Sequence, residues 1–276
     1  MTASVRRSGE SPSGVGLPRP LLIDLVVSEW VKLRTLRSSY WTLLAAIISM
    51  VGFGGLLDEA YVRHLTPVPQ TVLHVAGFSE SGFFLAELAI GVLGVLMLSG
   101  EYATGSIHST LAATPQRLGV LAAKAAVFTI VSFVVGLFAS FGAFFLGQAI
   151  FAGKGISVTL GDPGVLRSVI GAALYLAVFG LLSLGIGAVV RRTAGAIAIL
   201  VAVMIFLQVA VGGLPQTWQS TVTPYLPSVA GQMIIGPTKF TPPGPLLSPW
   251  TGFAVFCGYA TALLVVGGIS LHRRDA

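Results

Sequence analysis

Six apolar stretches, each long enough to cross a lipid bilayer, constrain the fold of this chain more than any other feature. A helix needs about 20 apolar residues to cross the hydrocarbon core, and every backbone polar group there must be satisfied within the protein. The stretches cover approximately residues 40–57, 78–99, 118–151, 165–190, 194–211 and 250–271. We therefore predict an all-α integral membrane protein with six transmembrane helices.

The composition agrees with a surface that faces lipid. Hydrophobic residues make up 54% of the chain and charged residues only 9%, whereas soluble domains carry about 25% charged residues. The net charge of +6 does not indicate nucleic-acid binding, because the basic residues stand at the ends of apolar runs, where topology signals lie. We expect no nucleic-acid partner.

The lysines and arginines predict the orientation. Positive residues concentrate in cytoplasmic segments of membrane proteins. With the N-terminus inside, 12 of the 16 Lys and Arg residues are cytoplasmic, and only Arg63, Lys154, Arg167 and Lys239 lie outside. The opposite orientation inverts this bias, so we predict that both termini are cytoplasmic.

The segments before the first span divide into two parts. Residues 1–20 are rich in Ser, Gly, Pro and Arg and are predicted to form a disordered cytoplasmic tail. Residues 21–276 are predicted to form a single transmembrane domain. Its first segment, about residues 21–38, is predicted to be an amphipathic interfacial helix, and the alternative is an extension of the first span. A helical wheel places Asp24, Ser28, Lys32 and Thr35 on one side and Leu22, Val26, Trp30, Leu33 and Leu36 broadly opposite.

Two loops are predicted to contain short structured pieces. The stretch Glu101–Arg117 should be cytoplasmic, and a short helix over about Ser106–Ala113 would end before Pro115; a plain connection is the alternative. The last outer loop, Gly213–Pro249, contains eight prolines. We predict that regular structure does not run through it, although the apolar residues 222–235 indicate a short interfacial or re-entrant piece.

Sequence motifs for chemistry are absent. There is no G-x-x-x-x-G-K-[ST] loop for nucleotide phosphates, no G-x-S-x-G elbow and no H-E-x-x-H pair. We expect no enzyme activity, no catalytic residue, no metal site and no cofactor on this chain. Any ATP would be hydrolysed by another polypeptide.

Glu87 is the polar residue that stands out within the spans. A carboxyl group at this depth costs about 2.5–3.5 kcal/mol on insertion scales, so it should face the bundle interior or a wet cavity. It is a candidate for the translocation path, and the alternative is a hydrogen-bonded structural glutamate. Small residues at a spacing of four, such as Ser132, Gly136 and Ser140, predict close helix packing.

Three segments resemble the permease subunits of ABC-2-type transporters of high-GC Gram-positive bacteria. These segments are Ser28–Ser38 (SEWVKLRTLRS), Gly100–Arg117 (GEYATGSIHSTLAATPQR) and Tyr225–Gly231 (YLPSVAG). The likeness covers the whole chain in the order of its spans. His108 stands where such permeases often carry Arg.

The resemblance implies a type V exporter-like architecture in a bacterial plasma membrane. The interfacial segment would be the elbow helix, with Glu29, Trp30, Lys32 and Arg34. The stretch with Glu101, Tyr102, Ile107, His108 and Leu111 would contain the coupling helix that docks on the ATPase. The partners would be two copies of an ATP-binding subunit, which would hold ATP and Mg, a second permease copy or a paralogue, and membrane lipid.

The resulting functional expectation is the permease subunit of an ATP-binding cassette exporter for a small molecule, drug, peptide or lipid. The alternatives are an ATP-independent transporter or channel and a polytopic membrane enzyme. An enzyme would need a catalytic constellation at one membrane depth, and the sequence offers none.

Overall fold

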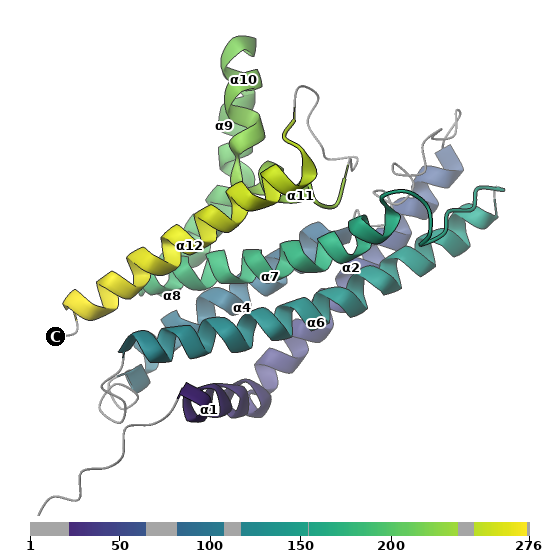
Figure 1. Ribbon diagram of the computed structural model, residues 1–276. Helices are drawn as coiled ribbons and strands as arrows, with labels where there is room; N and C mark the ends of the chain where they lie inside the picture. The colour runs from purple at the N-terminus through teal and green to yellow at the C-terminus, as the bar shows by residue number, and fades with distance from the viewer. Residues whose placement is uncertain (1–21, 65–81, 108–116, 154, 237–245, 275–276) are drawn as a thin grey trace, which may run out of the picture.

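The chain forms a bundle of long helices (Figure 1). The computed structural model describes residues 22–64, 82–107, 117–153, 155–236 and 246–274, and no strand occurs among them. Six helices in these ranges are long and apolar enough to cross a membrane, which confirms the predicted all-α fold. They are α2 (Arg37–His64), α4 (Phe83–Thr104), α6 (Arg117–Ala152), α7 (Val165–Val190), the helical run Thr193–Gly212 and α12 (Pro249–Arg274).

The predicted N-terminal tail, residues 1–20, lies outside the described residues. The predicted spans correspond one by one to the observed helices, but α2 is longer at both ends than residues 40–57. The second span was predicted to end at residue 99, whereas α4 continues to Thr104 and ends at Gly105, whose φ of 73° is left-handed. Glycine adopts this conformation readily and commonly terminates helices. Glu101 and Tyr102 therefore lie on the helix and not in the loop.

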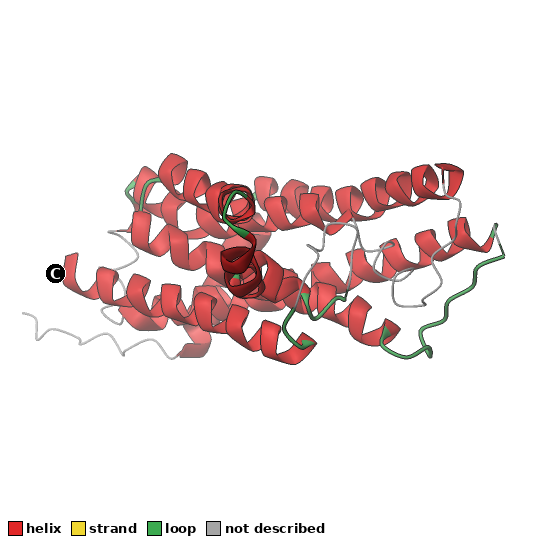
Figure 2. Cartoon of the chain, turned by 90° about the horizontal axis from the view of Figure 1, so that it is seen from above, coloured by secondary structure: helices red, strands yellow, loops and turns green. Residues whose placement is uncertain are grey.

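Helix α7 is the central helix of the bundle, packed between α4, α6 and α12. The long helices lie side by side in the view from above (Figure 2). Small residues permit the close contacts: a Cβ added to Gly136 on α6 would lie 2.9 Å from the Cα of Ala173, and one added to Gly187 on α7 would lie 2.9 Å from the carbonyl oxygen of Val95. The stripe of small residues on α6 thus packs within the chain.

Gly136 gives a direct test of this packing. Gly136→Leu is expected to lower the free energy of unfolding by about 1–3 kcal/mol, because an added side chain must displace the backbone of α7. Gly258→Leu on α12 is the matched control, since nothing lies within 4 Å of a Cβ at that position. Thermal unfolding in detergent micelles measures both variants, and equal melting temperatures would contradict the helix contact.

The helical run of the fifth span is bent. It consists of α8 (Thr193–Val201), a π-helical turn η2 (Ala202–Phe206) and α9 (Leu207–Gly212). A π turn disturbs the regular backbone ladder and is a common cause of a kink. Beyond it, α9 projects from the bundle together with α10 (Gln216–Val222) (Figure 1). Phe206 and Val209 are 67% and 68% exposed, as expected of side chains that face lipid.

The last outer loop contains more regular structure than the prolines predicted. After α10 follow a 3₁₀ turn, η3 (Thr223–Tyr225), and α11 (Pro227–Gln232). The prolines stand at the starts of these short pieces, where their missing N–H groups are not needed. The predicted piece over residues 222–235 is present, and its second half is buried against α12 and α7. Residues 237–245 lie outside the described part.

Candidate functional site

One end of the bundle gathers most of the basic residues of the helices, whereas Arg63 of α2 and Arg167 of α7 stand at the opposite end. The guanidinium of Arg117, at the start of α6, donates a hydrogen bond to the carbonyl oxygen of Leu271 near the end of α12 (3.2 Å). Arg191, which ends α7, donates to the carbonyl oxygen of Ser270 (2.7 Å). We call this the basic end. Helix α1 (Leu22–Thr35) also packs here, against α6.

Four charged side chains at the basic end form an ionic cluster, Glu29 and Lys32 of α1, Glu101 of α4 and Lys124 of α6. The Lys124 ammonium lies 2.7 Å from Glu29 Oε2 and 2.6 Å from Glu101 Oε1. The Lys32 ammonium lies 2.7 Å from Glu29 Oε1 and 3.1 Å from Glu101 Oε1. The cluster has no net charge and joins three helices that are distant in the sequence.

The cluster becomes more buried toward Lys124. The side chains of Lys124 and Glu29 are only 1% and 3% exposed, that of Glu101 is 14% exposed, and that of Lys32 is 41% exposed. A charge removed from water at such a position requires partners, and removing one partner of a buried pair typically costs about 3–5 kcal/mol. Each buried member of this cluster therefore requires the others.

Lys32 is the member that meets solvent. Its partial burial lowers the pKa of the ammonium, but the hydrogen bond and the charge of Glu29, followed by those of Glu101, outweigh this effect and raise the pKa above the ordinary value of 10.5. Lys32 therefore stays protonated at neutral pH and keeps both carboxylates neutralised at the edge of the cluster.

The cluster determines which face of α1 packs inward. The helix is interrupted at Leu36, so α1 is a separate helix and not an extension of the first span (Figure 1). Its buried residues are Leu25, Glu29 and Leu33, at a spacing of four. The face that packs on the bundle thus includes the charged Glu29, whereas Leu22, Trp30 and Leu36 of the predicted apolar side are exposed. The reason is that Lys124 supplies a partner that makes the burial of Glu29 favourable.

A cavity of about 550 Å³ adjoins the cluster between α1, α2 and α4. Its wall combines all four charged residues with hydroxyl groups and with apolar side chains such as Leu93 and Met97. The second carboxylate oxygen of Glu101, Oε2, is buried and has no hydrogen-bond partner among the described residues. The cavity is thus amphipathic.

The other residues of the predicted elbow and coupling segments are placed as follows. Trp30 and Arg34 are exposed on α1 and do not join the cluster. The ring of Tyr102 lies under the Arg191 guanidinium, 5.0 Å from it. Ile107 is 2% exposed and packs inside the chain. His108 and Leu111 lie outside the described residues, as does most of the predicted helix 106–113.

Glu87 is buried in the middle of the bundle, 1% exposed. The Tyr175 hydroxyl on α7 donates a hydrogen bond to Glu87 Oε1. The Tyr175 ring stacks on Phe256 of α12 with centroids 5.0 Å apart and meets Phe83 edge-on at 5.5 Å. Glu87 lines neither the cavity beside the ionic cluster nor the groove that lies between α6 and α12. The translocation path through Glu87 stays a prediction.

Tyr175→Phe tests the contact of Glu87. Removing the hydroxyl leaves the buried carboxyl group without this donor, and the free energy of unfolding should fall by about 1–3 kcal/mol. The double variant Tyr175→Phe/Glu87→Leu should recover part of the loss, because the buried carboxyl group that lost its donor is then absent. The Gln232 side chain, which also bonds the Tyr175 hydroxyl, loses that partner in both variants. A double variant less stable than the single one in thermal unfolding would contradict this reading.

The role of Glu87 in transport has its own test. Wild-type export by Glu87→Gln would exclude a requirement for the charge of the Glu87 carboxylate.

Among the described residues, no group of three or more His, Cys, Asp or Glu side chains could hold a metal ion. No protein-family model matches the chain, and no curated protein matches it either. The class defined by the observations is therefore a helical, multi-pass membrane protein with six apolar helices.

Proposed function

We propose that this chain is the transmembrane permease subunit of an ATP-binding cassette exporter, driven by a separate ATPase that docks at the basic end. The observation that carries the proposal is the ionic cluster, which ties the end of α4 to α1 and α6 immediately before the predicted coupling segment. In this proposal α1 is the elbow helix at the inner leaflet.

Under this proposal, the cluster transmits the ATP-driven movement of the ATPase to the transmembrane helices. The predicted coupling stretch begins on the last turn of α4 with Glu101 and Tyr102, and its predicted short helix, Ser106–Ala113, follows Gly105. A force on that segment acts on the last turn of α4, where the carboxylate of Glu101 is bonded to two ammonium groups. Because Lys124 and Lys32 belong to α6 and α1, the three helices would move together, as in rigid-body transitions of transporters.

The substrate would be amphipathic under this proposal. The cavity beside the cluster lies at the basic end and is lined by apolar side chains together with charged and hydroxyl-bearing ones. A substrate with an apolar body and a hydrogen-bond donor or cationic group would complement both. Entry would take place at the inner leaflet, between α1, α2 and α4.

The first test is whether a neighbouring gene encodes an ATP-binding cassette protein, and the second is co-purification of this chain with that protein. We expect the two proteins to elute together from detergent and the ATPase rate to rise with a subset of an amphipathic compound panel. An ATP-binding subunit from an unrelated transporter is the control and should not co-elute. Export by the chain in vesicles that lack any ATPase, or failure to recover the adjacent ATPase, would contradict the proposal.

A further inference from the structure

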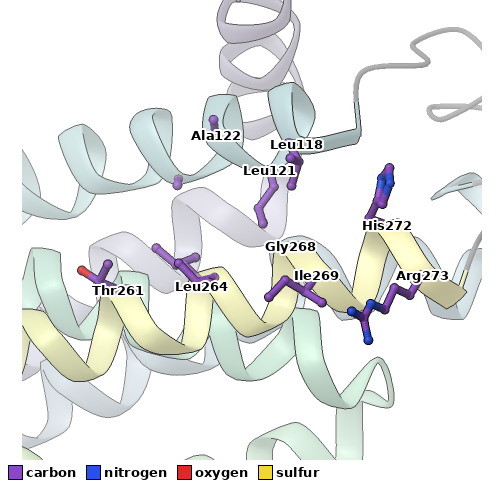
Figure 3. A pocket seen from close by; sticks show the side chains of 11 residues that line it. Leu118, Leu121, Ala122, Thr261, Leu264, Gly268, Ile269, His272 and Arg273 are labelled. Carbon is purple, nitrogen blue, oxygen red and sulfur yellow. The ribbon is translucent and has the colours of Figure 1, made fainter.

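A groove of about 580 Å³ lies between α6 and α12 at the basic end (Figure 3). Leu118 and Leu121 of α6 line one side, and Leu264 and Ile269 of α12 line the other. The volume is in the range of about 300–1,000 Å³ that small-molecule sites occupy. The groove is a slot with apolar walls between two helices that are apolar enough to cross a membrane.

One end of this groove carries positive charge. Arg273 and His272, both exposed, belong to its lining at the end of α12 (Figure 3). Arg117 stands beside Leu118, and among the described residues its guanidinium donates a hydrogen bond to the carbonyl oxygen of Leu271 alone. No Asp or Glu among the described residues forms an ion pair with any of these three side chains. Unlike the ionic cluster, this group of two arginines and a histidine has no acidic partner among the described residues.

We propose that the groove binds an anionic phospholipid, with an acyl chain between α6 and α12 and the phosphate at Arg273 and His272. Basic pockets between transmembrane helices on the cytoplasmic side are suited to anionic lipid headgroups. Arginine donates to phosphate in a bidentate manner, and a histidine ring carries an N–H donor in its neutral form as well. The inference does not depend on an ATPase partner.

The apolar wall distinguishes a lipid from other ligands. A free anion would use the cations but leave Leu118 and Ile269, which are 58% and 49% exposed, uncovered. A neutral lipid would cover the wall but leave the cations without a partner. Only an amphiphile with an acidic head satisfies both parts of the groove.

Native mass spectrometry of the full chain, released from detergent micelles, tests the site. The probes are phosphatidylglycerol and phosphatidylcholine with identical acyl chains. We expect phosphatidylglycerol to bind at least fivefold more tightly, and Arg273→Ala to weaken its binding about fivefold, the contribution of one basic residue near an anionic headgroup. The control is Arg192→Ala, an equal loss of charge at an exposed residue of the basic end whose side chain caps no helix.

A second variant examines the apolar slot. Ala122 lines the groove and is exposed on α6, so Ala122→Phe fills the slot without disturbing the core and should reduce lipid retention while Arg273 and His272 remain. Millimolar inorganic phosphate should not displace the lipid.

Four results would overturn the proposal. They are equal binding of the two lipids, equal effects of Arg273→Ala and Arg192→Ala, displacement by phosphate alone, and a change in the number of protomers instead of bound lipids in Ala122→Phe. The last result would assign the groove to a second copy of the chain.

Discussion

Replacing Lys124 with methionine is expected to lower the free energy of unfolding by about 3–5 kcal/mol, the cost of leaving a buried charge without its partner. Lys124 is the most buried member of the ionic cluster and contacts both Glu29 and Glu101 within 2.7 Å. In the variant, two carboxylates share only the half-exposed Lys32. Thermal unfolding in detergent micelles measures the loss.

A double variant separates the ionic effect from the loss of packing. Glu29→Gln/Lys124→Met removes one negative and one positive charge and leaves the pair between Lys32 and Glu101, which are 3.1 Å apart. It should therefore unfold at a higher temperature than Lys124→Met alone. If Lys124→Met melts like the wild type, or if the double variant is the less stable of the two, the cluster does not hold α1 to the bundle.

The second large effect concerns the coupling segment. Leu111→Asp is expected to reduce the recovery of the adjacent ATPase at least tenfold, because an unpaired carboxylate in an apolar contact costs more than the 1.4 kcal/mol that a factor of ten requires. Leu111 lies outside the described residues, and its assignment comes from the resemblance alone. Co-purification at a fixed ATPase concentration gives the measurement.

The control for this prediction is Ile107→Ala. Ile107 is also in the predicted segment, but it is buried within the chain, so its truncation should lower the melting temperature, with a loss of about 2–5 kcal/mol. Leu111→Asp should instead leave the melting temperature unchanged and affect only the partner. Full recovery of the ATPase with Leu111→Asp would exclude this residue from the contact.

The six helices could be predicted because lipid imposes a simple rule on sequence. Each span must be apolar over its whole length, whatever its neighbours are. The same rule could not predict where α4 ends, because a helix can continue beyond its apolar stretch. Glu101 marks the end of an apolar run, but its carboxylate is paired with Lys124 and Lys32, so the helix continues past it to Thr104.

The ionic cluster could not be predicted in the same way. Glu29 and Lys124 are 95 positions apart, and no local pattern specifies such a contact. A signal was nevertheless present: Lys124 lies a full two turns inside the apolar run of α6, where a charge requires a partner. The helical wheel of α1 separated polar from apolar residues, but it could not show which face packs on the bundle, because the partner of Glu29 lies on another helix. The π turn at Ala202–Phe206 had no sequence signal that we recognised.

The sidedness of the basic end tests the central claim most directly, since an ATPase can reach it only from the cytoplasm. Cys257 is the single cysteine, so Cys257→Ser provides a background for one new cysteine at a time. A membrane-impermeant maleimide should label Gly161→Cys, in the turn between α6 and α7 at the opposite end, on intact cells. It should label Arg192→Cys, at the basic end, only after permeabilisation. Labelling of Arg192→Cys on intact cells, with Gly161→Cys protected, would contradict the account.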